Sequence, residues 1–441
     1  MTGDMGQLGF GCGQDGPMRD ADLAFTRAIG EDIDASPTPY HAVTRARERL
    51  EAAGFVPYDP ASGPVGRWYH AKGGGLVAWV VSDEHDADSG LRIVGAHTDS
   101  PNLRLKPRPD TGSAGFGQLG VEIYGGVLLN SWLDRDLGIA GRVSVAGADA
   151  FEMRTFRDER PLARVPQLAI HLDRGVNDKG LVLNPQRHMV PVWGLGAASD
   201  FRAYLAEQVG VEPEAVMAWD AMFHDIAPAT LAGLDEEFLA SARLDNQLSC
   251  FTALSALLAV ADAPGETVPM IALFDHEEVG SVSTTGAASP FLRHQIERIA
   301  AGFGADHEAR LVSAARSIVI SADGAHATHP NYPERHEPEH QISLNGGPVI
   351  KINANQRYAT NAAGQAIVEY ACRNADIPVQ HFVTRTDLAC GSTIGPATAG
   401  ELGIDVVDVG IAQLGMHSAR EMCGSADPAL FAGALEAIFR A

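Results

Sequence analysis

Apolar residues near the N-terminus recur at the spacing of a helix face. Val43, Ala46 and Leu50 fall on one side of the second such stretch, and Gly54 marks its end. Longer apolar stretches further along the chain also predict helices. The pattern predicts helices at residues 20–35, 39–53, 248–261, 290–301, 365–374 and 427–440, with Asp427 as the candidate N-cap of the last.

Short apolar runs bounded by Gly, Asp or Ser indicate strands between these helices. They lie at residues 76–82, 91–96, 268–274, 317–321, 379–383 and 404–411. After residue 235 such strands alternate with helices, which predicts an α/β fold. Its central sheet should be mostly parallel and flanked by helices on both faces.

The middle of the chain shows a different pattern of apolar and polar residues. Alternating runs at residues 121–132, 141–146 and 167–172 favour β-structure, with one helix at residues 199–210. We therefore expect a β-rich second domain inserted into the α/β domain. The predicted division is an α/β domain at residues 21–100 plus 235–441, an inserted domain at 101–234 and a Gly-rich flexible leader at 1–20.

Charge and cysteine content narrow the classes of function. The net charge of -23 argues against a nucleic-acid binder and against docking on anionic membranes. No run approaches the ~20 apolar residues of a membrane span, and the first residues do not read as a secretory signal. Five scattered cysteines without a CxxC pair suggest a cytoplasmic setting and no cysteine-ligated zinc.

Metal-binding and acidic side chains occur in five short segments, most of them directly after an apolar strand. Ligands of open α/β sheets bind beyond the carboxyl ends of strands, so these positions suit one shared site. Each segment also has a structural reading, such as a hydrogen-bonded turn, a helix N-cap or a surface turn. The candidates are His97 with Asp99, Asp245, the pair Glu277 and Glu278, Asp323 with His326, and His417.

Together the segments supply two imidazoles and three carboxylates, with one glutamate to spare. That donor set suits zinc, manganese or cobalt. Two divalent ions roughly 3.5–4 Å apart need a shared carboxylate and a separate base, which this inventory can provide.

The segments resemble those of the aspartyl aminopeptidase family, a cytosolic branch of the co-catalytic zinc aminopeptidases. The resemblance runs from about Ala21 to the C-terminus and includes residues 95–107, 131–143, 275–281, 321–332, 390–396 and 416–421. It implies removal of N-terminal Asp or Glu from peptides and two Zn²⁺ per subunit, with Mn²⁺ or Co²⁺ as possible substitutes. It also implies a homo-oligomer, a dodecamer, assembled through the inserted domain.

The resemblance also implies roles for single residues. Asp245 would bridge the two metals, with His97 and Asp323 on one, and Glu278 and His417 on the other. The general base would be Glu277, and Asp99 would orient a metal-bound imidazole.

Three further residues concern substrate recognition and assembly. Lys351, with His326 and Tyr358 nearby, would anchor the acidic side chain of the substrate. On spacing alone, Lys351 could equally lie on the exposed face of an edge strand. His171 would reach the site of a neighbouring subunit and steady the tetrahedral intermediate, unless it is only a buried histidine on a strand.

Other functions remain open at this stage. A related two-metal aminopeptidase, carboxypeptidase or deacylase would share the metal ligands but would not need Lys351 and His326. A non-catalytic scaffold would be expected to have lost ligands or the base, and all are present. Residues 390–396 lack the form of a nucleophile elbow and are expected to line the substrate pocket and then begin a helix.

Overall fold

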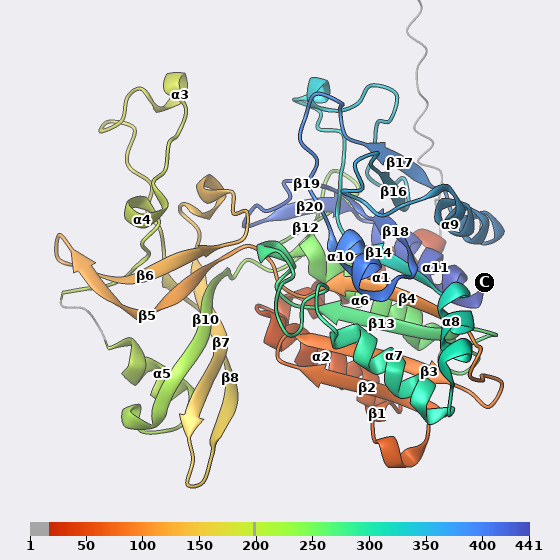
Figure 1. The fold of residues 1–441 in the computed structure, drawn as a ribbon. Coiled ribbons are helices and arrows are strands. Elements are labelled where there is room, and N and C mark those ends of the chain that lie inside the picture. The colour runs from red at the N-terminus through yellow and green to blue at the C-terminus, as the bar shows by residue number, and fades with distance from the viewer. Residues whose placement is uncertain (1–16, 197–199) are drawn as a thin grey trace, which may run out of the picture.

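The computed structural model describes residues 17–196 and 200–441. Its largest sheet has nine strands in the order β1-β2-β3-β13-β4-β14-β18-β16-β17 (Figure 1). The strands are β1 (Val56–Pro57), β2 (Gly66–Lys72), β3 (Gly75–Val81), β4 (Leu91–His97), β13 (Val268–Phe274), β14 (Ile318–Ala322), β16 (Val349–Ile352), β17 (Gln380–Val383) and β18 (Asp405–Gly410).

The centre of this sheet is parallel, as predicted. Strands β13, β4, β14 and β18 run side by side in one direction, and antiparallel pairs occur only toward the two edges. The central strands are apolar on both faces because both faces are covered. Strand β4 shows this directly: Val94 and Ala96 enter one core cluster, whereas Leu91 and Ile93 enter another.

Helices cover each face of the sheet and bury one of these clusters. One face carries α1 (Pro17–Asp34), α2 (Pro39–Ala52), α6 (Leu244–Val260), α9 (Ala362–Asn374) and α11 (Asp427–Arg440). The other carries α7 (Phe291–Gly302), α8 (His307–Ala315) and α10 (Ile394–Leu402). No helix in the described ranges is long and apolar enough to cross a membrane.

A second, six-stranded antiparallel sheet lies beside the first and has a core of its own (Figure 1). Its order is β8-β7-β10-β5-β6-β9, and α5 (Phe201–Val209) packs on it. The strands are β5 (Asn102–Ser113), β6 (Phe116–Tyr124), β7 (Leu137–Ala146), β8 (Phe151–Ala163), β9 (Val192–Leu195) and β10 (Val216–Asp225). The fold is thus α/β with a β-rich part.

Short elements complete the chain. A five-stranded sheet contains β11 (Thr230–Ala232), β12 (Phe238–Ser241), β20 (Glu421–Gly424), β19 (Ala412–Leu414) and β15 (Ala325–His326). Single helical turns are η1 (Pro60–Ser62), η2 (Leu129–Trp132), η3 (Pro213–Ala215), η4 (Glu277–Val279), η5 (Pro333–Arg335), α3 (Val176–Lys179) and α4 (Pro185–His188).

The strand predicted at residues 167–172 is wrong. This segment forms a turn in which the Leu172 N–H donates to the Ala169 carbonyl. Leu168, Ile170 and Leu172 alternate as in a strand, but they are 58%, 49% and 75% exposed and pair with no strand among the described residues. The alternation of apolar residues alone therefore predicted a strand where the chain forms a turn. Residues 166–184, which include α3, are called the arm below.

Two other expectations need correction. The run at residues 121–132 is not one strand, because β6 ends at Tyr124 and η2 follows. Asp427 is not an N-cap: it is the first residue of α11, and its carboxylate accepts N–H groups of Asn345 and Gly347. Most of the predicted leader lies outside the described residues, and helix α1 already begins at Pro17.

Candidate metal centre

The carboxyl ends of two neighbouring strands bring the first candidates together. His97 ends β4 and pairs in register with Phe274, the last residue of β13. Asp275 follows, and the next turn, η4, carries Glu277 and Glu278. The two apolar strands therefore place an imidazole and two carboxylates at the same edge of the sheet.

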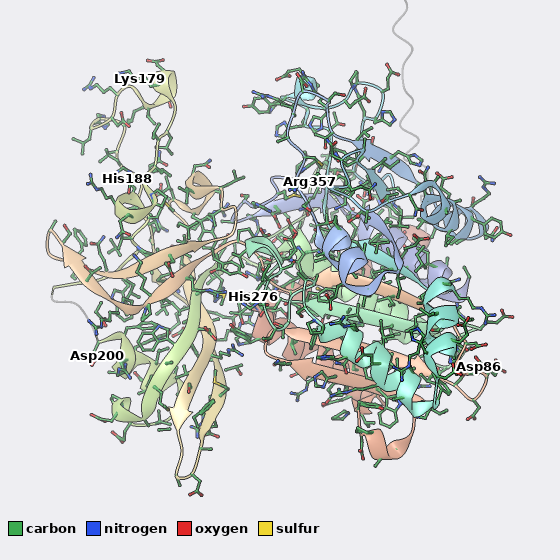
Figure 2. The ribbon with its side chains drawn as sticks, viewed as in Figure 1. Asp86, Lys179, His188, Asp200, His276 and Arg357 are labelled. Carbon is green, nitrogen blue, oxygen red and sulfur yellow. The ribbon has the colours of Figure 1, made fainter. Side chains whose placement is uncertain are left out.

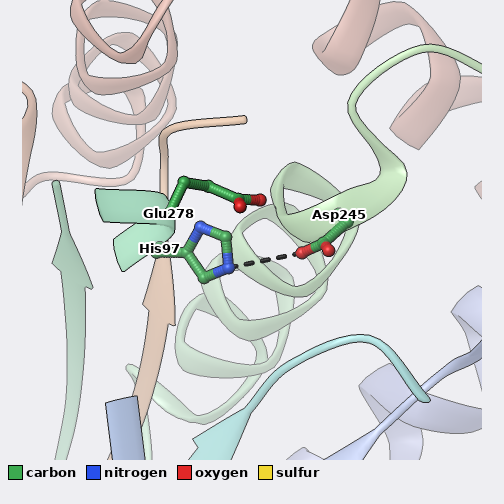
Figure 3. A group of neighbouring side chains, drawn as sticks. All are labelled: His97, Asp245 and Glu278. Atoms are coloured by element: carbon green, nitrogen blue, oxygen red, sulfur yellow. Dashed lines mark ion pairs between the residues drawn. The ribbon is translucent and has the colours of Figure 1, made fainter. Parts of the chain in front are cut away.

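Asp245 lies between the two histidines. Its Oδ1 is 3.3 Å from His97 Nε2, and its Oδ2 is 3.3 Å from His417 Nε2. It enters from the start of α6, opposite β4 and η4 (Figure 3). It does not cap the helix, so the N-cap reading is wrong. One carboxylate thus presents one oxygen to each imidazole.

A second carboxylate accompanies each histidine. Asp323 Oδ1 lies 3.5 Å from His97 Nε2, and Glu278 Oε1 lies 3.4 Å from His417 Nε2. The five predicted ligands therefore converge as two groups that share Asp245. Each group contains one imidazole nitrogen and carboxylate oxygens, the donors that zinc takes in proteins.

The other ring nitrogen of each histidine is occupied. His97 Nδ1 donates to the Asp99 carbonyl oxygen at 3.0 Å, and His417 Nδ1 donates to the Gly126 carbonyl oxygen at 3.0 Å. A carbonyl can only accept, so both Nδ1 atoms carry the proton. Both Nε2 atoms face the carboxylates and are the nitrogens available to a metal, as in metal-binding histidines. Burial opposes protonation of the two rings, but hydrogen bonds to Asp245 and its neighbours outweigh it and raise the pKa of His97 well above its usual value and that of His417 to about 10.

The charges at the centre also fit cations. Asp245 Oδ1 and Glu278 Oε1 are buried without a hydrogen-bond partner among the described residues. Burial, followed by the negative charge of Asp245, raises the pKa of Glu278 well above its usual value. Burial also raises the pKa of Glu277 to about 7. Buried carboxylates this close together repel one another, and divalent cations relieve that repulsion.

Asp99 organises the segment that carries the two glutamates. It is fully buried and accepts the backbone N–H groups of Glu277 at 3.1 Å and Glu278 at 3.2 Å. Its Oδ1 also lies 3.4 Å from His97 Nδ1. The Asp99 carboxylate therefore holds both the His97 ring and the backbone of the two glutamates in place.

Lys351 is buried beside this centre. It is 2% exposed, and its strand β16 lies between β17 and β18, so the reading as an exposed edge-strand lysine is wrong. Its Nζ donates to the Gly324 carbonyl oxygen at 3.0 Å and lies 3.5 Å from Asp323 Oδ2. The same Nζ is 5.1 Å from the centre of the Tyr358 ring.

The other two residues predicted to act on the substrate lie in different places. His326 is exposed, and its ring centre is 5.9 Å from that of Phe382, which also contacts Tyr358. His171 is exposed in the arm, so the buried-strand reading of this histidine is wrong. Figure 2 shows Lys179 at the far end of the arm, above the β-rich part and well separated from His276, which directly precedes Glu277.

Sequence reasoning missed Glu421. This buried carboxylate accepts the His417 N–H at 2.8 Å and the Asp245 N–H at 2.9 Å, so it holds the backbone of two predicted ligands. His417 has φ of 68°, a left-handed conformation that is costly for a residue other than Gly. The only signal in the sequence is an acidic residue four positions after His417, which is common elsewhere.

Comparison with known proteins gives the class and then the family. The family model described as "Aminopeptidase I zinc metalloprotease (M18)" matches residues 33–439. A probable M18 family aminopeptidase 2 of Streptomyces coelicolor is 49% identical over 427 residues, which is 95% of this chain and 98% of that protein. A relative with the same description in Mycobacterium tuberculosis is 46% identical over 428 residues, again 95% and 98%.

Solved structures agree with this match. The structure titled "Cryo-EM structure of the Ape4 and Nbr1 complex" is 37% identical with a TM-score of 0.91, covering 96% of this chain and 87% of that one. Yeast aminopeptidase 1 is 28% identical with a TM-score of 0.84, covering 95% and 97%. The fold and the clustered donors define a zinc metalloprotease. Within that class, the chain belongs to the M18 family and is an aminopeptidase.

The substitution Glu421→Gln tests whether Glu421 holds Asp245 and His417 in position. The amide keeps one accepting oxygen but places an NH₂ group against the other backbone N–H, so the geometry of Asp245 and His417 should loosen. We expect zinc affinity to fall about 10-fold or more, measured by competition with a chromophoric chelator. The control is Glu436→Gln, whose carboxylate lies in a surface ion pair with Arg440 and is 38% exposed. Equal zinc affinity of both variants would show that Glu421 does not support the ligands.

Proposed function

We propose that the protein is an aminopeptidase with two zinc ions per subunit that removes N-terminal Asp or Glu from peptides. The observation that carries the two-zinc part is the position of Asp245, whose two oxygens face different histidines at 3.3 Å. A single-metal site would not need a carboxylate shared in this way.

The proposed ligands are His97 and Asp323 for one zinc and Glu278 and His417 for the other, with Asp245 common to both. Bound there, the ions would polarise the scissile carbonyl and lower the pKa of a water molecule. Glu277 is adjacent to this set and is not needed as a ligand. Its carboxylate takes the proton of the attacking water and delivers it to the leaving amine.

Lys351 supplies the proposed preference for acidic substrates. It is a buried cation in a protein with a net charge of -23, and it lies next to Asp323. A substrate carboxylate near Tyr358 and His326 would pair with this amine. Such a pair in a poorly solvated site discriminates strongly against an uncharged side chain.

The arm supports a proposed homododecamer. Its apolar side chains are exposed in the single chain, with Leu172 at 75% and Val182 at 84%. One solved relative, 28% identical with a TM-score of 0.82, is titled as a dodecamer of S. cerevisiae mApe1. We propose that a neighbouring copy covers the arm and receives His171 at its active site. The four described cysteines are free, which fits the proposed cytoplasmic setting.

The substitution Glu277→Gln tests whether Glu277 acts as the general base or as a metal ligand. The amide has nearly the shape of the acid but cannot take a proton, so turnover should fall at least about 10²–10⁴-fold. Zinc content, measured by elemental analysis, should stay at the wild-type value. Glu308→Gln, an exposed change on α8, controls for the loss of one charge. If Glu277→Gln lost zinc, Glu277 would be a ligand and the proposed division of the glutamate pair would be reversed.

Lys351→Met tests substrate recognition. The loss of one charge-assisted contact should lower kcat/KM for Asp- and Glu-amides about 10- to 100-fold. The value for the Leu-amide should change little, and the exposed Lys72→Met should change neither. Initial rates on the three amides, with and without chelator, provide the measurement. A wild-type preference for Leu would favour a general aminopeptidase instead.

Mixed oligomers test the role of His171. His171→Ala and Glu277→Gln should each be nearly inactive when expressed alone. Co-expression should restore up to about one quarter of wild-type activity, because some intact Glu277 sites then adjoin a chain with an intact His171. Mixtures that stay as inactive as the separate variants, or a fully active monomer, would rule out action between subunits.

A further inference from the structure

A short segment at the end of β6 contacts one of the two ligand groups and the Asp99 carboxylate beside the other. Residues 124–128, called the connector below, begin at the last residue of β6 and run past η4 and the loop that carries His417. The resemblance gives this segment no role. Three of its residues, Tyr124, Gly126 and Leu128, hydrogen-bond to Asp99 or to His417.

The first contact is made by Tyr124. Its hydroxyl donates to Asp99 Oδ2 at 2.7 Å, and the Arg104 guanidinium stacks 4.1 Å from the centre of its ring. Asp99 in turn holds the backbone of Glu277 and Glu278. The connector is therefore linked to the glutamate pair through one buried carboxylate.

The second contact fixes His417 at two points. The Gly126 carbonyl accepts from the ring Nδ1 at 3.0 Å, and the Leu128 N–H donates to the His417 carbonyl at 3.1 Å. The backbone of His417 has the unfavourable φ of 68°. External contacts must hold such a conformation, and the connector provides two of them.

The connector also packs closely against the side chains of His417 and Glu278. A Cβ atom on Gly126 would lie 2.8 Å from His417 Nδ1, and one on Gly125 would lie 3.0 Å from Glu278 Cβ. The φ of Gly125 is 73°, whereas Gly126 has no positive φ. At residue 126 an alanine would therefore be tolerated by the backbone and would disturb only the imidazole.

We propose that the connector is a positioning segment through which the six-stranded sheet sets the zinc affinity of its own subunit. The proposal rests on the proposed ligand roles of His417 and Glu278. The six-stranded sheet then has a function inside each chain as well as any function in assembly. Displacing it relative to the nine-stranded sheet would move His417 away from Asp245 and Glu278.

Gly126→Ala tests this proposal, with Gly120→Ala as the matched control. Gly120 lies on β6 itself, and a Cβ there would meet its nearest neighbour, Pro109 O, at an ordinary 3.5 Å. Zinc affinity of the purified, zinc-loaded full chain is measured by competition with a chromophoric chelator. We expect one of the two zinc ions to bind about 10- to 100-fold more weakly in Gly126→Ala, and no change in Gly120→Ala.

Two further readouts separate positioning from general destabilisation. The visible absorption of the cobalt-substituted protein should change in Gly126→Ala, because the imidazole orientation changes, while the Tm of the metal-free protein should match the control. Tyr124→Phe should lower kcat for any accepted substrate about 10-fold without raising KM. Its control is Tyr204→Phe, which removes a hydroxyl that donates to Asp158 on the far part of the same sheet.

The outcomes distinguish this proposal from the proposed function. If wild type holds two zinc ions, His417→Ala holds one, and Gly126→Ala binds both as tightly as Gly120→Ala, the connector proposal is wrong. If His417→Ala retains both ions with unchanged affinity, the proposed ligand set fails instead, and the connector proposal falls with it.

Discussion

Mutual repulsion of buried carboxylates is the constraint on which the site depends. Asp245, Glu278, Asp323 and Glu277 come together, with the imidazoles of His97 and His417 and the amine of Lys351 close by. Such a cluster is unstable unless cations bind or protons are taken up. The surrounding structure resists this repulsion by holding the ligand backbone as well as the imidazole rings: Asp99 accepts the N–H groups of Glu277 and Glu278, and Glu421 accepts those of Asp245 and His417.

The path of the chain explains why these contacts cross between sheets. It leaves the nine-stranded sheet directly after His97, builds the six-stranded sheet, passes through β11 and β12, and enters α6, whose first turn carries Asp245, before β13 rejoins the first sheet. The exit from the nine-stranded sheet and the start of α6 therefore both lie at the metal centre. A site at this junction is shaped by two cores at once, and their relative position is part of its geometry. The same arrangement makes the hydrogen bond from Tyr124 to Asp99 possible.

Much of the fold and of the proposed ligand set could be predicted because both leave strong local signals. Apolar runs revealed β4, β13 and β14, and an acidic or imidazole side chain directly after each run marked the sheet edge. Glu421, Tyr124 and Gly126 could not be found in this way. They act through backbone atoms or through another side chain, and no spacing rule reports such contacts. The arm was misread because alternation predicts burial of one face, whereas Leu168, Ile170 and Leu172 are exposed on a turn. Helix α8, which has no buried residue, and strand β2, only partly buried, were not predicted, because neither contains a long apolar run.

Asp323 divides its two oxygens between different tasks. Oδ1 faces His97 at 3.5 Å, and Oδ2 lies 3.5 Å from the Lys351 amine. In the proposed mechanism one carboxylate is therefore common to a metal position and to the recognising cation. Free-energy coupling through a shared group is reciprocal. An ion that draws more electron density from Asp323 leaves Lys351 less neutralised and more attractive to an anionic side chain. Under the proposed ligand set, metal identity and substrate selectivity would be linked through this carboxylate, so that exchanging the ion would change the preference among peptides as well as the rate.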